Sequence, residues 1–318
     1  MDVKHLRQIF TMVLLFCFLC TPCVPSHAQE IQWYITEDGG ILGPEGWSIS
    51  PDGEVLVADN CDITNLTPLV DSIFYLPVMT MYLPHNRIVD LAPLQDMIWM
   101  FSLNVSYNRI TDITPLSGMD EIMYLYLSGN AITDFTPLYD KPELMVLWLN
   151  DIPDLDLHWL QNLPRLQEIH LANNGLSNDD LLPLANIKPL YRLNVSGNQL
   201  GTLSVVSALS DEFTFLFVDD TGISDLQPLT AHGSLIELYA RDNQITDLTP
   251  LQELMELEIL DISGNPVTDL TPLYALRILE KLYIMDMPYL SQEQVDALRE
   301  ALYWCEIFYS AANVQEAP

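Results

Sequence analysis

Apolar residues recur along the chain with a regular period. An apolar–x–apolar pair, such as Leu125-Tyr126-Leu127, is followed after two residues by a marker position that is usually Asn. The alternation predicts a short strand with two side chains pointing inward and one outward. The marker spacing is mostly 22 residues, with values of 23, 24 and 26 elsewhere, which predicts eleven coils of chain. The markers are Asn60, Asn86, Asn108, Asn130, Ile152, Asn174, Asn198, Thr221, Asn243, Asn265 and Met287.

A second phrase, Ile-Thr-Asp-Leu-Thr-Pro-Leu or a close variant, follows many of the markers, as at Ile110–Leu116 and Ile245–Leu251. A buried Asn at the marker can satisfy backbone groups of the turn, where Leu could not. The Thr-Pro pair predicts the start of a return limb. In that prediction the Thr is the N-cap and the Pro is the first helical residue, at Thr114, Thr136, Thr249 and Thr271 with the prolines that follow them.

The combined pattern, L-x-L-x-x-N-x-I-T-D-L-T-P-L, is a leucine-rich repeat. It closely resembles the internalin-type repeats of bacterial surface proteins over about residues 55–287. The resemblance implies an α/β repeat fold: a curved solenoid with a parallel β-sheet on its concave face and short 3₁₀ or irregular turns on its convex face. The same expectation follows from burial, because one coil cannot cover its own apolar side whereas stacked coils share a core.

Both ends of the array differ from the repeat. Residues 29–54 contain Trp33, Trp47 and two turn motifs, which predicts a small β-rich N-terminal cap. Residues 288–318 are expected to form a C-terminal cap, in which 291–294 fit a capping box and the apolar residues 295, 298 and 302 recur at helical spacing. The segment Cys305–Tyr309 is expected to be a short closing strand.

Residues 1–28 resemble a targeting segment rather than part of the fold. A short basic start with Lys4 and Arg7 precedes an apolar stretch, and Ser26-His27-Ala28 places small residues before a cut. This is typical of a secretory signal peptide cleaved near Ala28. The stretch is shorter than the roughly 20 residues that a membrane span needs. A lipoprotein signal is the alternative, but the residues before Cys20 and Cys23 lack the expected small side chains. We therefore expect a secreted or periplasmic protein.

The charge balance excludes one large class of function. The chain of 318 residues has 12 Lys and Arg against 44 Asp and Glu, for a formal net charge of −32. A nucleic-acid binder needs a basic surface, and a hydrophobic content of 49% is too high for an acidic disordered chain. Beyond residue 28 only Cys61 and Cys305 remain. They lie ten coils apart, or roughly 48 Å, which is too far to form a disulfide within the monomer that we expect.

The register of the predicted strands identifies a concave binding surface. In each strand the residue between the apolar pair points outward, and so does the residue before the pair. These columns are rich in aromatic side chains, which commonly form binding hot spots. The alternative is that the rings only stabilise strand pairing. The candidate ligand-binding residues are Tyr82, Tyr124, Tyr126, Trp148, His170, Arg192, Phe215, Phe217, Tyr239, Arg241 and Tyr283.

The Asp of each Ile-Thr-Asp phrase forms a further column. Its members are Asp90, Asp112, Asp134, Asp225, Asp247 and Asp269. Backbone N–H groups of the adjacent turn would offset their mutual repulsion. Calcium held between neighbouring carboxylates is the alternative, although the sequence contains no D-x-D-x-D-G loop. The irregular coils around residues 150–209 are compatible with either a functional loop or neutral drift.

We therefore expect an exported, non-enzymatic protein without a cofactor. Neither a zinc-protease H-E-x-x-H motif nor a nucleophile elbow is present. The partner is predicted to be a protein with a basic surface, because acidic residues such as Glu237 and Asp242 lie near the concave strands. Neither nucleic acid nor a membrane span is expected. A glycan-binding module and a structural solenoid holding divalent ions at the Asp column remain the alternatives.

Overall fold

A computed structural model describes residues 34–35, 39–43, 46–73, 76–210 and 212–310. The predicted signal peptide and Trp33 lie outside this part of the chain. The described strands form one sheet in which each strand pairs with its neighbours in sequence order. The first strands, β1 to β4, pair antiparallel, whereas β4 to β15 pair parallel. A parallel sheet in sequence order requires each connection to return over the same face, as a solenoid does.

All the strands are short. Their bounds are β1 Tyr34–Ile35, β2 Ile41–Leu42, β3 Ser48–Ile49, β4 Val55–Val57, β5 Thr80–Tyr82, β6 Ser102–Asn104, β7 Tyr124–Tyr126, β8 Val146–Trp148, β9 Glu168–His170, β10 Arg192–Asn194, β11 Phe215–Phe217, β12 Glu237–Tyr239, β13 Ile259–Asp261, β14 Lys281–Tyr283 and β15 Glu306–Phe308. Parallel pairing keeps corresponding residues of successive coils side by side, so that each strand position becomes a continuous column.

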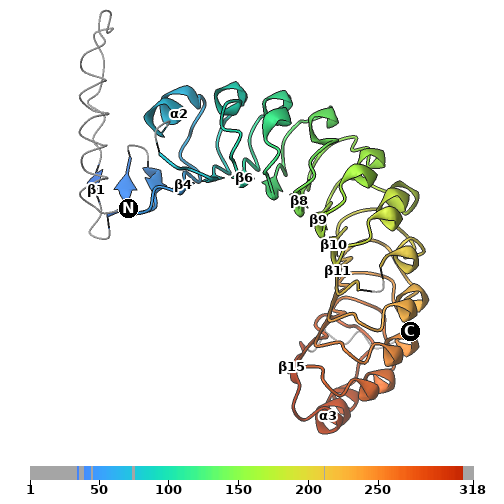
Figure 1. Ribbon diagram of the computed structural model, residues 1–318. Coiled ribbons are helices and arrows are strands. Elements are labelled where there is room, and N and C mark those ends of the chain that lie inside the picture. Colours follow the sequence, from blue (N-terminus) through green and yellow to red (C-terminus); the bar gives the residue numbers. More distant parts are fainter. Residues whose placement is uncertain (1–33, 36–38, 44–45, 74–75, 211, 311–318) are drawn as a thin grey trace, which may run out of the picture.

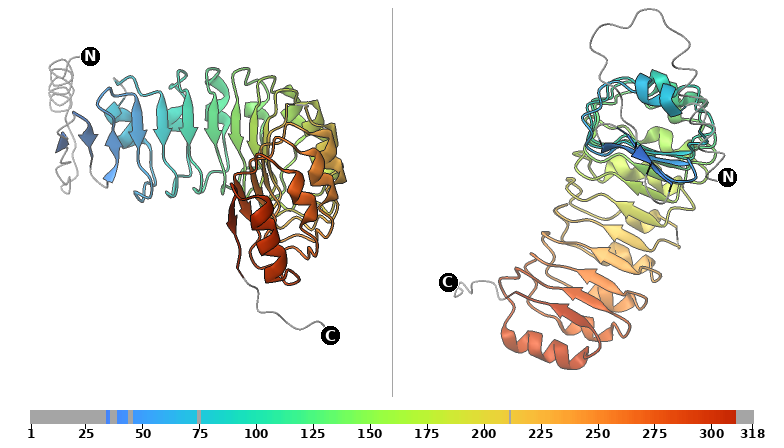
Figure 2. Two further views of the ribbon diagram at one scale, coloured as in Figure 1. Left: turned by 90° about the horizontal axis from the view of Figure 1, so that it is seen from below. Right: turned by 90° about the vertical axis from the view of Figure 1, so that its left-hand side faces the viewer.

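The return limbs are mainly short 3₁₀ helices. The helices are α2 Thr67–Ile73, η2 Ala92–Leu94, η3 Thr114–Gly118, η4 Thr136–Leu138, η5 His158–Asn162, η6 Asp179–Asn186, η7 Val206–Ala208, η8 Gln227–Ala231, η9 Thr249–Glu253, η10 Thr271–Ala275 and α3 Gln292–Ala301. They line the outer side of an arc whose inner side is the sheet (Figures 1 and 2). Helical turns are wider than the strand spacing of about 4.8 Å, and the stack therefore curves toward the sheet. The predicted fold class is confirmed.

One apolar core runs through the whole stack. The central residue of every parallel strand from β4 to β14 points into it and is almost completely buried, from Leu56 through Leu125 to Leu282. The leucines of the return limbs, such as Leu116 and Leu251, meet these residues from the outer side. Each coil therefore buries its apolar side only against its neighbours.

The Asn markers form a buried hydrogen-bond ladder, as the sequence predicts. Asn130 Oδ1 accepts the Ile110 N–H at 3.0 Å. Its Nδ2 donates to the Leu127 carbonyl of its own coil and to the Val105 carbonyl of the previous coil. Each Asn of this kind therefore ties two coils together.

The first marker was assigned wrongly. Pairing of Leu56 with Met81 makes Cys61, not Asn60, the counterpart of Asn86. Asn60 is exposed and has a φ of 53°. A positive φ is the backbone conformation of the residue immediately before each ladder position. Cys61 is buried, and its backbone N–H donates to Asn86 Oδ1 at 3.0 Å. The first spacing is consequently 25 residues.

The Asp column is explained by backbone hydrogen bonding. Oδ1 of Asp112 accepts the Thr114 N–H at 2.8 Å, and the other five Asp residues of the column accept the N–H two residues ahead in the same way. This is an Asx turn. The predicted role of the Thr residues was wrong: Thr114 is the first residue of η3, and the capping oxygen comes from Asp112. The Pro is the second helical residue.

The C-terminal end has the predicted elements. Ser291 and Gln294 form the capping box at the start of α3, and Val295 and Leu298 are fully buried beneath it. Strand β15 then extends the sheet by pairing with β14. Cys61 follows β4 and Cys305 precedes β15, so the two cysteines lie at opposite ends of the parallel stack, as expected. Among the helices of the described residues, none combines the length and apolar character needed to cross a membrane.

Candidate binding surface on the concave face

The predicted outward columns are continuous. Parallel pairing aligns Tyr126 with Trp148, Trp148 with His170, and Phe217 with Tyr239. The strand-initial residues align in the same way, so that Tyr124, Glu168, Arg192 and Phe215 belong to the neighbouring column. Arg241 lies two residues beyond β12. The structure therefore brings ten of the eleven candidate residues into two adjacent columns, with Arg241 at their flank.

We call the column formed by the last residue of each strand the aromatic column, and its rings pack on one another. Tyr126 meets Trp148 edge-on, with ring centroids 5.0 Å apart, and Trp148 lies 4.4 Å from His170. Phe217 and Tyr239 stack nearly parallel at 4.7 Å. Tyr82, at 42% exposure, is the most open of the candidate aromatics, and His170 is buried at 9%. Our expectation of an exposed His170 was therefore wrong: its neighbours cover it.

Glu168 is the centre of a polar network between β8 and β10. Its carboxylate accepts hydrogen bonds from Trp148 Nε1 at 3.2 Å and His170 Nε2 at 2.9 Å, and it pairs with Arg192 Nε at 3.4 Å. The Arg192 guanidinium lies 4.1 Å above the centre of the Phe215 ring. Glu168 therefore locks the orientation of Trp148, His170 and Arg192.

The charges of this network compensate one another. Burial raises the pKa of Glu168, but the hydrogen bond and charge of His170, the Trp148 N–H and the Arg192 charge outweigh it and hold the pKa below its ordinary value. Arg192 is in turn held by Glu168 and its aromatic neighbours. At the flank, Arg241 Nε pairs with Asp242 at 3.0 Å. Both basic candidates are thus already paired within the protein.

Hydrogen bonding also fixes the orientation of the His170 ring. Asn194 Oδ1 accepts the Ser196 N–H at 3.0 Å, which leaves Asn194 Nδ2 facing His170 Nδ1 at 3.4 Å. The other ring nitrogen, Nε2, lies 2.9 Å from the Glu168 carboxylate. His170 is therefore held between Glu168 and Asn194 and acts as a positioning group.

Sequence inspection missed several residues of this surface. Met79 and Phe101 precede β5 and β6 and are each 38% exposed, and Phe101 contacts Tyr124 with ring centroids 5.2 Å apart. At the other end Phe308 stacks on Tyr283, with ring centroids 4.5 Å apart, and prolongs the aromatic column. The strand predicted at Cys305–Tyr309 could have revealed Phe308, if its register had been extended from β14.

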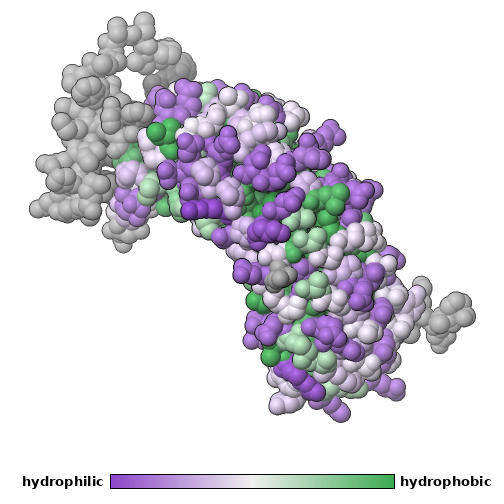
Figure 3. Space-filling model, turned by 45° about the vertical axis from the view of Figure 1, so that its right-hand side comes forward, coloured by the Kyte–Doolittle hydropathy of each residue, from purple (hydrophilic) through white to green (hydrophobic). Residues whose placement is uncertain are grey.

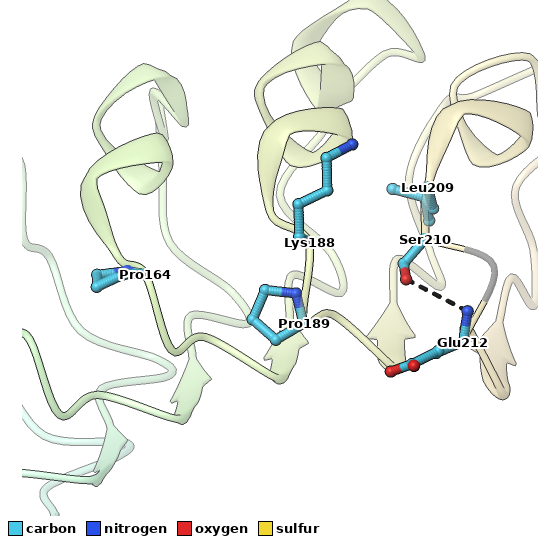
Figure 4. Close-up of a pocket in the computed structure, with 6 residues that line it drawn as sticks. All are labelled: Pro164, Lys188, Pro189, Leu209, Ser210 and Glu212. Carbon is cyan, nitrogen blue, oxygen red and sulfur yellow. Dashed lines mark hydrogen bonds between the residues drawn. The ribbon is translucent and has the colours of Figure 1, made fainter.

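Other surfaces of the described residues offer less. A shallow depression of about 620 Å³ is lined by Pro164, Lys188, Pro189, Leu209, Ser210 and Glu212. It lies on the limbs that lead from the outer turns to the strands (Figure 4), away from the concave columns. Figure 3 shows one flank of the solenoid, where hydrophilic residues surround smaller apolar patches. No group of three or more His, Cys, Asp or Glu side chains suited to a metal ion occurs in the described part.

Comparison with known proteins agrees with this geometry. A family model described as "Leucine Rich repeats (2 copies)" matches residues 233–275. A solved internalin (InlF) from Listeria monocytogenes is 22% identical, with a TM-score of 0.66, and the match covers 82% of this chain and 81% of that one. The chain is a leucine-rich-repeat solenoid of internalin-like fold. A leucine-rich-repeat solenoid is commonly a protein–protein interaction module.

Two further solved structures share the solenoid fold. The functional domain of InlJ from Listeria monocytogenes is 21% identical, with a TM-score of 0.60; the match covers 83% of this chain and 55% of that one. The ectodomain of the Arabidopsis thaliana receptor kinase GASSHO1/SCHENGEN3, solved in complex with CASPARIAN STRIP INTEGRITY FACTOR 2, is 20% identical, with a TM-score of 0.58. That match covers 74% of this chain and 30% of the receptor chain. No curated protein sequence matches this one.

Proposed function

We propose that this solenoid is an exported, non-enzymatic protein that binds a protein partner on its concave face. The observation that carries the proposal is the ordered aromatic column centred on Tyr126 and Trp148, whose rings Glu168 and His170 hold in fixed positions. Pre-ordered aromatic side chains contribute binding energy at low entropic cost. In this proposal residues 1–28 are removed near Ala28, and residues 29–54 and 288–318 cap the solenoid.

Ring packing favours a protein partner over a glycan. Sugar-binding aromatic residues offer an open ring face, whereas Phe217 and Tyr239 cover each other and Trp148 lies between Tyr126 and His170. A protein can instead use ring edges, the apolar rim and the charged groups around them. The receptor ectodomain with a similar fold, solved in complex with CASPARIAN STRIP INTEGRITY FACTOR 2, supports the same choice.

The test uses a concave variant and a matched aromatic control. The wild-type chain is used to capture and identify a partner from the extracellular fraction of its source, and the Kd of the purified pair is then measured. Trp148→Ala should weaken binding at least tenfold, because truncating a central anchor residue costs about 2 kcal/mol or more. Tyr303→Ala removes an aromatic side chain that is 83% exposed beyond α3 and should leave Kd unchanged.

Folding and ligand class are tested separately. The circular dichroism spectrum of Trp148→Ala must match that of the wild type for its loss of binding to be assigned to the surface. Equal affinity of wild type and Trp148→Ala would refute the concave site. Binding to a glycan array with no protein partner captured would favour the glycan alternative instead.

A further inference from the structure

Charge is unevenly distributed along the concave face. Over β5 to β8 the outward strand residues are all uncharged, as are the residues immediately before each strand. We call this the uncharged segment; it consists of Met79, Thr80, Tyr82, Phe101, Ser102, Asn104, Met123, Tyr124, Tyr126, Met145, Val146 and Trp148. In a chain with 44 acidic residues, the outward strand positions of four successive coils carry none, and the one acidic residue that follows these strands at the flank, Asp151, accepts a hydrogen bond from the Tyr107 hydroxyl.

The opposite character develops beyond β10. Glu237 of β12 and Asp261 of β13 lie in the outward columns, and Asp219, Asp220 and Asp242 follow the strands at their flank. We call these five residues the acidic segment. Among the described residues neither Glu237 nor Asp261 forms an ion pair. Two basic residues lie nearby: Arg241 pairs with Asp242, and the exposed Lys281 begins β14 in the same column as Glu237 and forms no ion pair within that part of the chain. The Glu168 network of β8 to β10, which compensates its own charge, separates the two segments.

The carboxylates of the acidic segment influence the pKa values of their neighbours. Burial raises the pKa of Asp219, and the carboxylates of Asp261 and Asp242 raise it further, whereas the backbone N–H and the charge of Arg241 lower it. Burial is also the main cause of the raised pKa of Tyr239; the Glu237 charge adds to it and the Arg192 charge opposes it. The carboxylates of the acidic segment therefore act on one another and on Tyr239, and a cation bound beside them would be favoured.

The dimensions fit a single extended chain. Each strand presents two outward side chains about 7 Å apart, and eight strand spacings separate Tyr82 of β5 from Asp261 of β13, or about 38 Å. A fully extended segment of about 12 residues has this length. The strip is thus long and narrow, with one apolar and one acidic end.

Building on the concave site proposed above, we infer that the partner contributes an extended polypeptide segment that is apolar and uncharged at one end and rich in Lys or Arg at the other. The apolar end packs on the uncharged segment. The basic end pairs with Glu237 and Asp261, neither of which forms an ion pair within the described residues; Asp261 accepts only the Ser263 N–H, at 2.9 Å. The basic surface that the composition leads us to expect on the partner therefore contacts only the half of the concave face that carries the acidic segment.

Selection from a library of random 15-residue peptides displayed on phage tests the inference with the full chain. Enriched peptides should combine aromatic or aliphatic residues at one end with two or more Lys or Arg at the other. For a synthetic peptide of this kind, Glu237→Gln with Asp261→Asn should weaken binding about tenfold and reduce its salt dependence. Tyr82→Ser should weaken binding and leave the salt dependence unchanged.

A matched variant controls for net charge. Glu253→Gln with Glu300→Gln removes two carboxylates from η9 and α3, outside the concave columns, and should leave peptide binding unchanged. No enrichment, enrichment without basic residues, or equal binding by the Glu237/Asp261 variant would each overturn the inference. These results leave the concave site itself standing if the captured protein still requires Trp148; a partner that binds independently of Trp148 refutes both.

Discussion

At the scale of single residues, one amide side chain performs the same task in coil after coil. Seven Asn residues donate to carbonyls of two coils, and all seven accept an N–H from the coil before: Asn86, Asn108, Asn130, Asn174, Asn198, Asn243 and Asn265. Buried backbone groups need such partners. An aliphatic residue would fill the space and leave these groups unsatisfied.

Removing one amide should therefore destabilise the solenoid strongly. Asn130→Ala leaves the Ile110 N–H and the Leu127 carbonyl without their partner and the Val105 carbonyl with Asn108 alone, and we expect a loss of about 3 kcal/mol in the free energy of unfolding. Urea denaturation followed by circular dichroism measures it. Asn162→Ala, at the exposed end of η5, should change stability by less than about 0.5 kcal/mol. Similar losses in both variants would contradict the ladder's role.

The residue before each ladder position has a left-handed backbone in all eleven coils. The residues are Asn60, His85, Tyr107, Gly129, Asp151, Asn173, Gly197, Asp220, Asp242, Gly264 and Asp286. Tyr107 is the unusual member, because bulky side chains are disfavoured in this region. Its ring lies over Gly129 and stacks on His85 with ring centroids 4.9 Å apart, and its hydroxyl donates to Asp151 Oδ2 at 3.0 Å. Gly129 is thus required both by its backbone and by the ring above it.

Comparing two glycines separates the cost of the left-handed backbone from the cost of the contact with the Tyr107 ring. Gly129 and Gly222 have φ of 66° and 71°, but a Cβ at Gly129 would overlap the Tyr107 ring whereas one at Gly222 meets no atom within 4 Å. Gly222→Ala should cost about 1 kcal/mol from the backbone alone. Gly129→Ala should cost about 2 kcal/mol more, most of it recovered by adding Tyr107→Ala. Thermal unfolding of the three variants and the wild type checks this; equal costs at the two glycines would argue against the steric contact.

At the scale of elements, each coil's return limb depends on an Asx turn. The carboxylate of Asp112 accepts hydrogen bonds from the Thr114 side chain and N–H, which lower its pKa below 3.8; Asp134 and Asp247 are lowered by Thr136 and Thr249 in the same way. A lowered folded-state pKa contributes stability that is present above 3.8 and lost as pH falls through the folded pKa. Acid should therefore loosen the outer turns.

Replacing these carboxylates with amides tests that dependence. An Asn side chain can accept the same backbone N–H through Oδ1 but has no charge to titrate. The variant Asp112→Asn/Asp134→Asn/Asp247→Asn should fold at neutral pH and lose less stability than the wild type between about pH 5 and pH 3. Melting temperatures across this range measure the difference. Identical acid profiles would show that these three carboxylates do not contribute to the acid sensitivity.

Much of the element order could be predicted, because a period-2 strand and a fixed coil length determine which side chains share a column. That reasoning placed Tyr126, Trp148 and His170 side by side, as the structure does. It also predicted the capping box at Ser291. Fold class and outward columns are therefore properties of the repeat itself.

Other features depend on contacts that a one-dimensional pattern does not contain. Asn60 was chosen over Cys61 because Asn is the usual marker, whereas strand pairing determines the register. The burial of His170 arises from Trp148 and Glu168 on neighbouring strands. Similarly, Lys141 occupies a core position, where its ammonium donates to the Ser117 carbonyl at 2.7 Å. Each of these features depends on how the residues of neighbouring coils pack on one another.

At the scale of the whole molecule, repulsion between acidic residues opposes folding. A net charge of −32 on an arc of stacked coils places like charges near one another along its length, and such self-repulsion destabilises the compact state. The Asp column contributes because its members recur in every regular coil. The pKa of Asp134 is lowered mainly by Thr136, yet the charge of Asp112 acts in the opposite direction. The repeat that builds the solenoid therefore also generates the repulsion.

Salt should relieve this repulsion, and the type of cation separates screening from binding. The Debye length falls from about 30 Å at 0.01 M to about 8 Å at 0.15 M ionic strength, so NaCl should raise the melting temperature over this range, with little further gain beyond it. Because the Asp oxygens already accept backbone N–H groups, CaCl₂ and MgCl₂ at equal ionic strength should give the same increase. Calorimetry measures each curve. An additional increase specific to CaCl₂, abolished in the triple Asp→Asn variant, would instead show that the Asp column binds calcium and that ions stabilise the stack.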